Sequence, residues 1–226
     1  VGVTNFGTGG FETFDSSVNL NSTNFGQVLA ASAADPFLFE FIQINSQYYV
    51  AGDLKFALNA ASAINWCRTQ GFADSNIIID IILLYAKTQT YVDVSSYTTI
   101  NFLERTADIY KYNLVMRDLT DIPLIFPQVQ VRYVTAPAAG LFSTGNPIDF
   151  TPSDIQSLIQ AGTQDGQNVV NAGNGVHFQS LNEDFLVKKY SQKLGRTVSV
   201  EEAKKIHLKA GAKIAQFNTN TNLRQQ

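Results

Sequence analysis

Prolines cluster in one stretch of this sequence and separate segments that can be helical from one that cannot. Five of the six prolines lie between Pro123 and Pro152. Proline lacks a backbone N–H and clashes with the preceding helical turn, so no long helix is expected across this stretch. Within it, residues 128–134 alternate apolar and polar side chains, which predicts a strand. Because prolines flank it, we expect an edge strand or an isolated ribbon.

The sequence ahead of the prolines predicts helices. Asp35 followed by Pro36 is a typical helix start, because aspartate caps the first turn and proline fits its geometry. Apolar side chains at helical spacing follow, and the next segment carries many alanines, which permit close packing of helices. The predicted helices cover residues 37–49, 53–71 and about 95–119.

The side chains of the helix expected over residues 95–119 fall on two faces. Apolar residues recur at intervals of three and four, which predicts the face that packs on the core. They are Leu103, Ala107, Tyr110 and Leu114. The charged residues lie off this stripe and are expected on the solvated side. They are Glu104, Arg105, Asp108 and Lys111.

A nearly uniform apolar segment, residues 76–86, is interrupted by Asp80. Its isoleucines favour a strand, while its length and the following lysine favour a helix, and we expect a helix. It is far shorter than the ~20 apolar residues that cross a bilayer, so no membrane span is predicted. Burial of Asp80 would raise its pKa, unless a cation such as Arg68 pairs with it.

Residues 1–24 read as an extended N-terminal arm. They are rich in Gly, Asn, Ser and Thr and carry three spaced aromatic side chains, Phe6, Phe11 and Phe14. Such an arm can lay aromatic rings on the surface of a partner. A pair of strands joined by a glycine turn is the alternative interpretation.

Charge is distributed unevenly along the chain. Residues 183–226 carry nine Lys and Arg against four Asp and Glu, whereas residues 1–182 carry seven against fifteen. The C-terminal part is also predicted to be helical, because residues 180–183 and 199–202 both match a capping box and Gly195 lies between them. An acidic body with a basic helical arm suggests that the arm binds an acidic partner or a neighbouring copy.

These patterns together predict a mainly α fold. We expect a single helical domain with a small proline-flanked β ribbon and extended N- and C-terminal arms. The expected divisions are an arm over residues 1–24, a mainly helical body over 25–178 with the ribbon near 128–134, and a basic helical arm with a mobile tail over 179–226.

Few residues point to catalysis or to a cofactor. There are two histidines and one cysteine, Cys67, which excludes a histidine-rich metal site and an internal disulfide. The glycines at 140 and 145 have the spacing of a phosphate-binding loop, but Asn146 and Pro147 stand where that loop needs Lys and Ser or Thr. We predict no cofactor, no metal and no catalytic set.

One short segment resembles a known family. Phe185 and Leu186, the run from Gln192 to Arg196 and then Glu202 are similar to the helix–Leu-Gly-Arg–helix ending of phycobilisome linker domains. The similarity covers about 20 of the 226 residues and would imply a linker-like role in a larger complex. A helix that ends at a glycine before a capping box explains the same residues without kinship.

The composition favours a structural subunit over an enzyme. Charged residues make up 15% and aromatic residues 12% of the chain, and surfaces covered by other subunits are depleted in charge and rich in aromatics. We expect a non-enzymatic assembly subunit, linker-like or of the virion or tail type, that binds other protein subunits with an acidic surface. The expected contact residues are Phe6, Phe11, Phe14, Lys188, Lys189, Lys193, Arg196, Lys204, Lys205, Lys209 and Lys213.

Two alternatives remain at this point. An enzyme of the hydrolase type could use Asp80 as a carboxylate with a perturbed pKa. The C-terminal lysines could instead bind the backbone of a nucleic acid, although the acidic pI of about 5.3 and the scarcity of arginine and aromatic residues among them argue against it.

Overall fold

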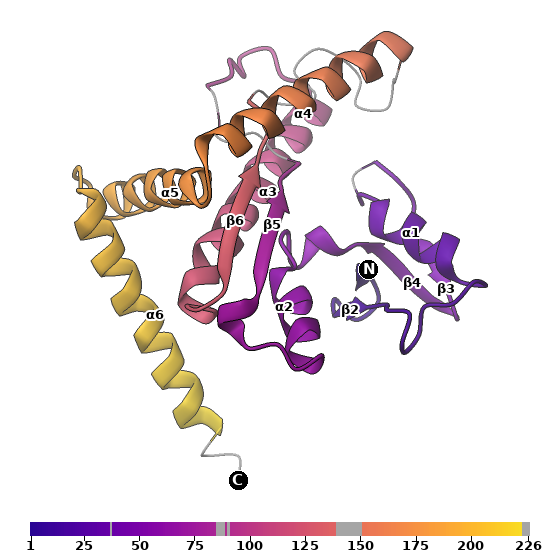
Figure 1. The fold of residues 1–226 in the computed structure, drawn as a ribbon. Coiled ribbons are helices and arrows are strands. Elements are labelled where there is room, and N and C mark those ends of the chain that lie inside the picture. Colours follow the sequence, from indigo (N-terminus) through magenta and orange to yellow (C-terminus); the bar gives the residue numbers. More distant parts are fainter. Residues whose placement is uncertain (37, 85–88, 90, 139–150, 223–226) are drawn as a thin grey trace. The chain divides into compact units, whose positions relative to one another are not determined.

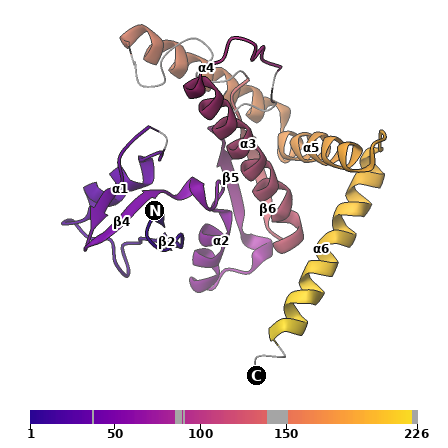
Figure 2. The same ribbon diagram turned by 180° about the vertical axis from the view of Figure 1, so that it is seen from behind.

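A computed structural model describes residues 1–36, 38–84, 89, 91–138 and 151–222, and gives only the backbone of 213–222. Across these residues the chain forms six strands, six α-helices and two short 3-10 helices, drawn from two opposite sides in Figures 1 and 2. In chain order they are β1 (Gly2–Asn5), β2 (Phe11–Thr13), α1 (Phe25–Ala33), β3 (Ile42–Ile44), β4 (Gln47–Ala51), η1 (Gly52–Leu54), α2 (Ala60–Thr69), η2 (Asp74–Asn76), β5 (Ile78–Ile82), α3 (Thr99–Ile125), β6 (Gln130–Thr135), α4 (Pro152–Ala172), α5 (Val176–Leu194) and α6 (Val200–Asn222).

The chain divides into two compact units. Unit 1 comprises residues 1–71 and 89–118, and unit 2 comprises residues 72–88 and 119–226. Helix α3 contributes its residues up to Asp118 to unit 1 and its last turns to unit 2.

Unit 1 is built on a four-stranded antiparallel sheet with the strand order β2-β1-β4-β3. Helix α1 packs against β1, β3 and β4. The core between them is closed by aliphatic and aromatic side chains, and Phe14 meets Tyr49 edge to face with ring centroids 5.7 Å apart. The buried core residues are Val3, Phe14, Val28, Ala31, Ile44 and Tyr49.

Turn chemistry explains why the first residues form strands. The Asn5 Oδ1 atom accepts hydrogen bonds from the N–H groups of Gly7 and Thr8, both at 3.1 Å, and Gly9 has a positive φ of 69°. These features reverse the chain between β1 and β2. In the same way, Asn45 and Ser46 both have positive φ and join β3 to β4 in a two-residue hairpin.

Unit 2 contains a two-stranded parallel sheet and three helices. Strands β5 and β6 pair in parallel, with an irregularity in the register at Ile79/Asp80. Helices α4 and α5 pack on β6, and α5 packs on α6. Gly195, with a φ of 65°, ends α5, and the Ser199 Oγ atom accepts the N–H of Glu202 at 3.2 Å to cap α6.

The predicted fold class is wrong in its details. The chain contains two small sheets, and residues 1–24 are not an extended arm, since β1 and β2 are integral strands of the unit 1 sheet. The alternative of a strand pair with a glycine turn describes them correctly. The C-terminal residues up to Asn222 are helical rather than extended.

Two predicted helices are strands. Residues 42–44 and 47–51 form β3 and β4 where a helix was expected, because the Asn45–Ser46 turn imposes a hairpin. Residues 78–82 form β5, as their isoleucine content favoured. The strand predicted over 128–134 is confirmed as β6, although it pairs with β5 and so is not an isolated ribbon. The predicted domain boundaries at residues 24 and 178 stay predictions.

Helix α3 follows the expected division into two faces only in part: Glu104 and Asp108 are exposed as predicted, but other positions differ. Leu114 is buried as predicted, but Leu103 and Tyr110 are exposed. Lys111, expected on the solvated side, is buried with only 6% of its surface accessible. In the first half of α3, one charged residue, Lys111, is therefore buried, while an apolar side of the helix faces outward.

Candidate functional site

The basic residues singled out from the sequence lie mainly on a hairpin of two helices, α5 and α6, within unit 2 (Figure 1). A small core holds the helices together, with Leu186 and Tyr190 from α5 against Val198 and Ala203. The hairpin is further fixed by the Val198 N–H, which donates to the Ser191 Oγ atom at 3.1 Å. The lysines are thus displayed on a defined scaffold.

Two of the basic side chains are already paired within the hairpin. The Lys204 Nζ atom lies 2.7 Å from the Glu183 Oε1 atom, and Arg196 forms a bidentate ion pair with Glu202. The hydrogen bond from Lys204 lowers the pKa of Glu183, and the one from Arg196 lowers the pKa of Glu202. The Lys204–Glu183 pair joins α6 to α5, and the Arg196–Glu202 pair joins the connecting turn to the first turn of α6, so both cations already have partners within the hairpin.

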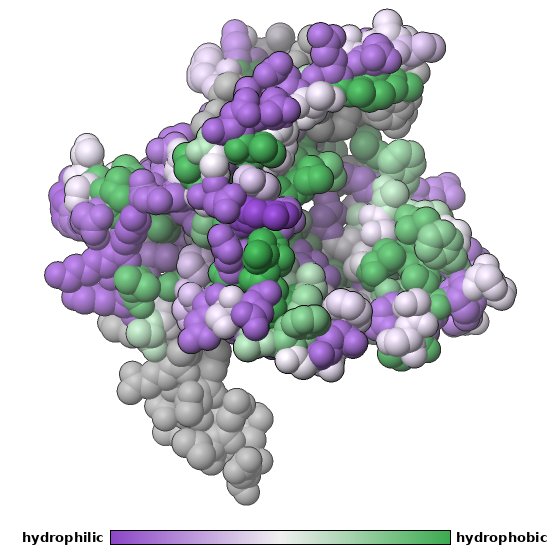
Figure 3. Space-filling view, in the orientation of Figure 1, coloured by the Kyte–Doolittle hydropathy of each residue, from purple (hydrophilic) through white to green (hydrophobic). Residues whose placement is uncertain are grey.

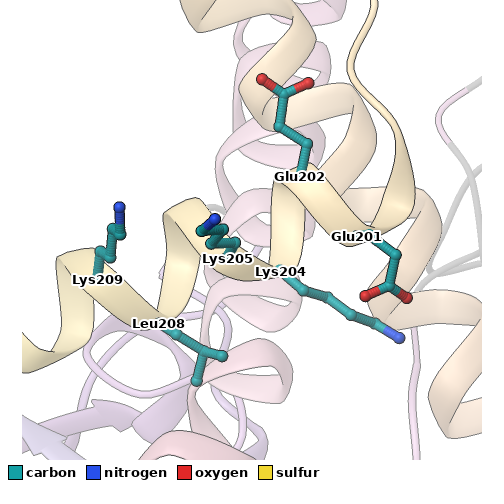
Figure 4. A pocket seen from close by; sticks show the side chains of 6 residues that line it. All are labelled: Glu201, Glu202, Lys204, Lys205, Leu208 and Lys209. Carbon is teal, nitrogen blue, oxygen red and sulfur yellow. The ribbon is translucent and has the colours of Figure 1, made fainter.

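Four other lysines are exposed and form no ion pair with the described residues: Lys188, Lys193, Lys205 and Lys209. Figure 4 shows that Lys205 and Lys209 point to the same side of α6, one turn apart. The side chain of Lys213 lies outside the described residues. Lys205 and Lys209 are therefore the lysines best placed to meet an acidic partner.

The surface beside these lysines is open. A shallow depression of about 630 Å³ is lined, among the residues whose side chains are described, by α6 alone: Glu201, Glu202, Lys204, Lys205, Leu208 and Lys209 (Figure 4). One face of one helix cannot enclose a small molecule, so this surface is suited to another macromolecule.

Lys189 and His207 have different surroundings from the other basic residues. The Lys189 Nζ atom lies 5.8 Å from the ring centroid of Phe185 and 5.7 Å from that of Tyr190. His207 is buried, with 8% of its surface accessible; its Nδ1 atom lies 3.1 Å from the Tyr190 hydroxyl and its Nε2 atom 3.4 Å from the Thr120 carbonyl oxygen. A carbonyl can only accept, so Nε2 carries the proton and Nδ1 accepts from the tyrosine.

The predicted N-terminal contact residues divide into one exposed and two packed aromatics. Phe6 is exposed on the turn after β1. Phe11 packs edge to face on Phe56 with ring centroids 5.1 Å apart, and Phe14 is in the unit 1 core. Phe6 alone of the three is available to a partner, and it does not share a unit with the basic hairpin.

Asp80 is half exposed and forms a two-pronged ion pair with Arg132 across the β5–β6 sheet. The hydrogen bonds from Arg132 lower the pKa of Asp80. The alternative of a general acid required burial and a raised pKa, and neither is found at this position. The predicted cationic partner was correct in type, but the residue is Arg132 and not Arg68.

Sequence reasoning missed an apolar patch on the outward side of α3. Phe102 is 64% exposed, and Leu103, Ile109 and Tyr110 are also exposed on the same side of the helix. The opposite side is held by Lys111, whose Nζ atom pairs with Asp35 and lies 3.3 Å from the Asp53 Oδ2 atom. The missed signal was that two aspartates at the starts of predicted helices, Asp35 and Asp53, could pair with a buried lysine.

No helix in the described part of the chain is long and apolar enough to cross a membrane. Nor do three or more His, Cys, Asp or Glu side chains in that part gather in a way that could hold a metal ion. No model of a known protein family matches the chain, and no curated protein matches it.

Proposed function

We propose that this protein is a structural subunit that assembles with other protein subunits through exposed apolar side chains and the lysines of the α5–α6 hairpin. The observation that carries the proposal is the outward apolar side of α3, with Phe102, Leu103, Ile109 and Tyr110 open to solvent. Large aromatic and aliphatic side chains grouped on one helix face are typical of the buried centre of a protein interface.

Further apolar surface lies open elsewhere in each unit. In Figure 3 hydrophobic side chains reach the surface both over unit 1 and over the sheet strands of unit 2. Helix α4 exposes Ile155, Ile159 and Val170, and β5 exposes Ile78 and Ile82. Burying such surface contributes roughly 25 cal/mol per Å², so covering it by partners is favourable.

The hairpin lysines would affect the orientation of the bound partner and the rate of association more than the affinity. Lys205 and Lys209 lie together on an exposed side of α6, as Figure 4 shows. Exposed charges steer association over distances up to about 10 Å at moderate salt, and salt screens them. An acidic patch on another subunit is the matching partner.

The first test is the molar mass in solution, measured by light scattering after size exclusion at about 0.05 M and 0.5 M salt. The expected mass exceeds the 24.8 kDa of one chain at low salt and falls as salt rises. Lys205→Glu with Lys209→Glu should abolish the salt-dependent part, and Phe102→Glu should lower the mass at both salt concentrations.

Exposed positions outside these surfaces provide the control. Lys55→Glu changes an exposed lysine of unit 1 by the same charge and should leave the mass unchanged. A chain that remains a monomer at low salt and at the highest soluble concentration would contradict self-assembly.

Nucleic-acid binding is the second candidate, and the exposure of Lys205 and Lys209 is the observation that favours it. Binding to phosphates through these lysines would weaken steeply with salt, by a slope near the number of phosphates contacted. Titration of a fluorescent oligonucleotide at low salt tests it directly, and absence of binding there excludes it.

A further inference from the structure

Among the described residues, strand β5 has one edge paired with β6 and one edge that no strand covers. The Ile77 carbonyl oxygen accepts from the Gln130 N–H at 3.0 Å, and the Leu83 N–H donates to the Thr135 carbonyl at 2.8 Å, so the odd-numbered residues bond to β6. Successive residues of a strand direct their N–H and C=O groups to opposite edges. Ile78, Asp80 and Ile82 therefore direct theirs away from β6, and no other described strand pairs with them.

The same three residues carry their side chains on the open face of the sheet. Ile78 is 52% and Ile82 77% exposed, whereas Ile77, Ile81 and Leu83 are buried on the other face. Parallel sheets normally have both faces covered, and two strands alone are marginally stable in water. An open edge beside an apolar face is a template for another strand.

The sequence of β5 is self-complementary. Ile78-Ile79-Asp80-Ile81-Ile82 reads the same in both directions. Two such strands in antiparallel register about Asp80 place Ile78 opposite Ile82 of the second copy and Asp80 opposite its own equivalent. The outward-directed groups then face each other, and each of these pairs exchanges two hydrogen bonds.

The ion pair with Arg132 removes the one obstacle to this register. Like charges directly opposite each other destabilise a strand pair, and the register brings two Asp80 carboxylates together. Arg132 already holds each carboxylate through two hydrogen bonds, so the two aspartates meet as neutralised pairs.

We infer that the open edge of β5 pairs with the β5 edge of a second copy of this chain, in antiparallel register about Asp80. The result is a continuous sheet in the order β6-β5-β5-β6 with a two-fold axis, the commonest symmetry of soluble oligomers. The inference rests on the proposed assembly function and names one partner, a second copy, and one contact within it.

The test uses the full chain carrying Phe102→Glu at about 0.5 M salt, so that contacts through the lysines are screened and those through the α3 patch are removed. Light scattering should give a mass near twice 24.8 kDa. Ile82→Pro removes an N–H that β6 does not use, so it should leave β5–β6 intact and reduce the mass to one chain. Ile82→Lys, at a side chain that is already exposed, should do the same, and circular dichroism confirms that both variants fold.

Three further variants separate edge pairing from a general loss of apolar surface. Val18→Lys alters a residue that is 79% exposed in unit 1 and should leave the mass unchanged. Arg132→Gln should weaken the dimer about tenfold, because the two carboxylates then face each other unneutralised. Adding Asp80→Asn to Arg132→Gln should restore the affinity of the dimer, because no carboxylates then face each other.

The outcomes distinguish this inference from the function on which it rests. A chain that associates at low salt but has the mass of one chain at 0.5 M salt overturns β5 pairing and leaves assembly through the lysines in place. A dimer at 0.5 M salt that resists both Ile82 variants also overturns it, because the contact then lies elsewhere.

Discussion

Two buried titratable side chains, Lys111 in unit 1 and His207 in unit 2, fix long helices to the rest of their units. Lys111 binds α3 to Asp35 and Asp53, which lie on either side of the β3–β4 hairpin. His207 binds α6 to Tyr190 of α5 and to the Thr120 carbonyl at the end of α3. In both cases a polar contact between residues far apart in sequence decides which side of a helix faces inward.

Lys111→Met should destabilise unit 1 by about 3–5 kcal/mol, because it leaves two carboxylates beside each other without their cation. Urea unfolding followed by circular dichroism measures the change. Lys55→Met, at an exposed lysine of the same unit, should change the free energy of unfolding by less than about 0.5 kcal/mol. If the two substitutions changed the free energy of unfolding equally, the buried ion pairs would contribute nothing to stability.

His207 should make the protein less stable as the pH falls from about 7 to 5. Burial lowers its pKa below the usual 6.5, with Lys189 acting in the same direction and the Thr120 carbonyl and Asp121 opposing it. The folded state therefore binds fewer protons than the unfolded state, so the stabilisation is complete above the unfolded pKa and is lost as pH falls through the folded pKa.

Unfolding by urea across this pH range gives the measurement. His207→Gln should flatten the pH dependence of the free energy of unfolding. Five carboxylates with lowered pKa lose their contribution only at more acidic pH: Asp15, Asp80, Asp93, Glu183 and Glu202. Burial raises the pKa of Asp108, so this residue acts with the opposite sign and stabilises the fold as the pH falls. If the free energy of unfolding of His207→Gln depends on pH as steeply as that of the unmodified chain, groups other than His207 cause the pH dependence.

At the scale of the elements, local signals predicted some structures well and others badly. The alternation of β6 and the capping serine of α6 are signals contained within a few residues, and both predictions are confirmed. The helix expected over 37–49 failed because a two-residue turn at Asn45 and Ser46 outweighed the apolar spacing around it. The exposed side of α3 could not be predicted, since it depends on Asp35 and Asp53, more than fifty residues away.

Helix α4 contains two glycines that no contact requires. Gly162 and Gly166 lie inside the helix, and a Cβ atom at either position would meet no atom of the described residues within 4 Å. Replacing each by alanine should raise the free energy of unfolding by about 0.5–1 kcal/mol. Gly173→Ala should lower it, because this residue ends α4 with a φ of 99°. Thermal unfolding of the three variants tests the contrast.

At the scale of the whole molecule, charge and apolar surface are divided between the units. Unit 1 holds nine Asp and Glu against five Lys and Arg, whereas the exposed lysines Lys188, Lys193, Lys205 and Lys209 lie on the hairpin of unit 2. Contacts through the lysines should respond to salt, and contacts through α3 and β5 should not. Mass measurements at two salt concentrations therefore report on the two kinds of surface separately.

The path of the chain through its units also has a consequence for synthesis on the ribosome. Unit 1 is interrupted by residues 72–88, so its Lys111 emerges only after β5 has been made. Strand β5 must then wait for α3 and for β6, at the 5–20 residues per second of translation, with its isoleucines unpaired. A nascent chain that pauses between β5 and β6 exposes the unpaired, isoleucine-rich strand β5, which is prone to aggregation. A chaperone that shields β5 until β6 emerges would raise the yield of folded protein.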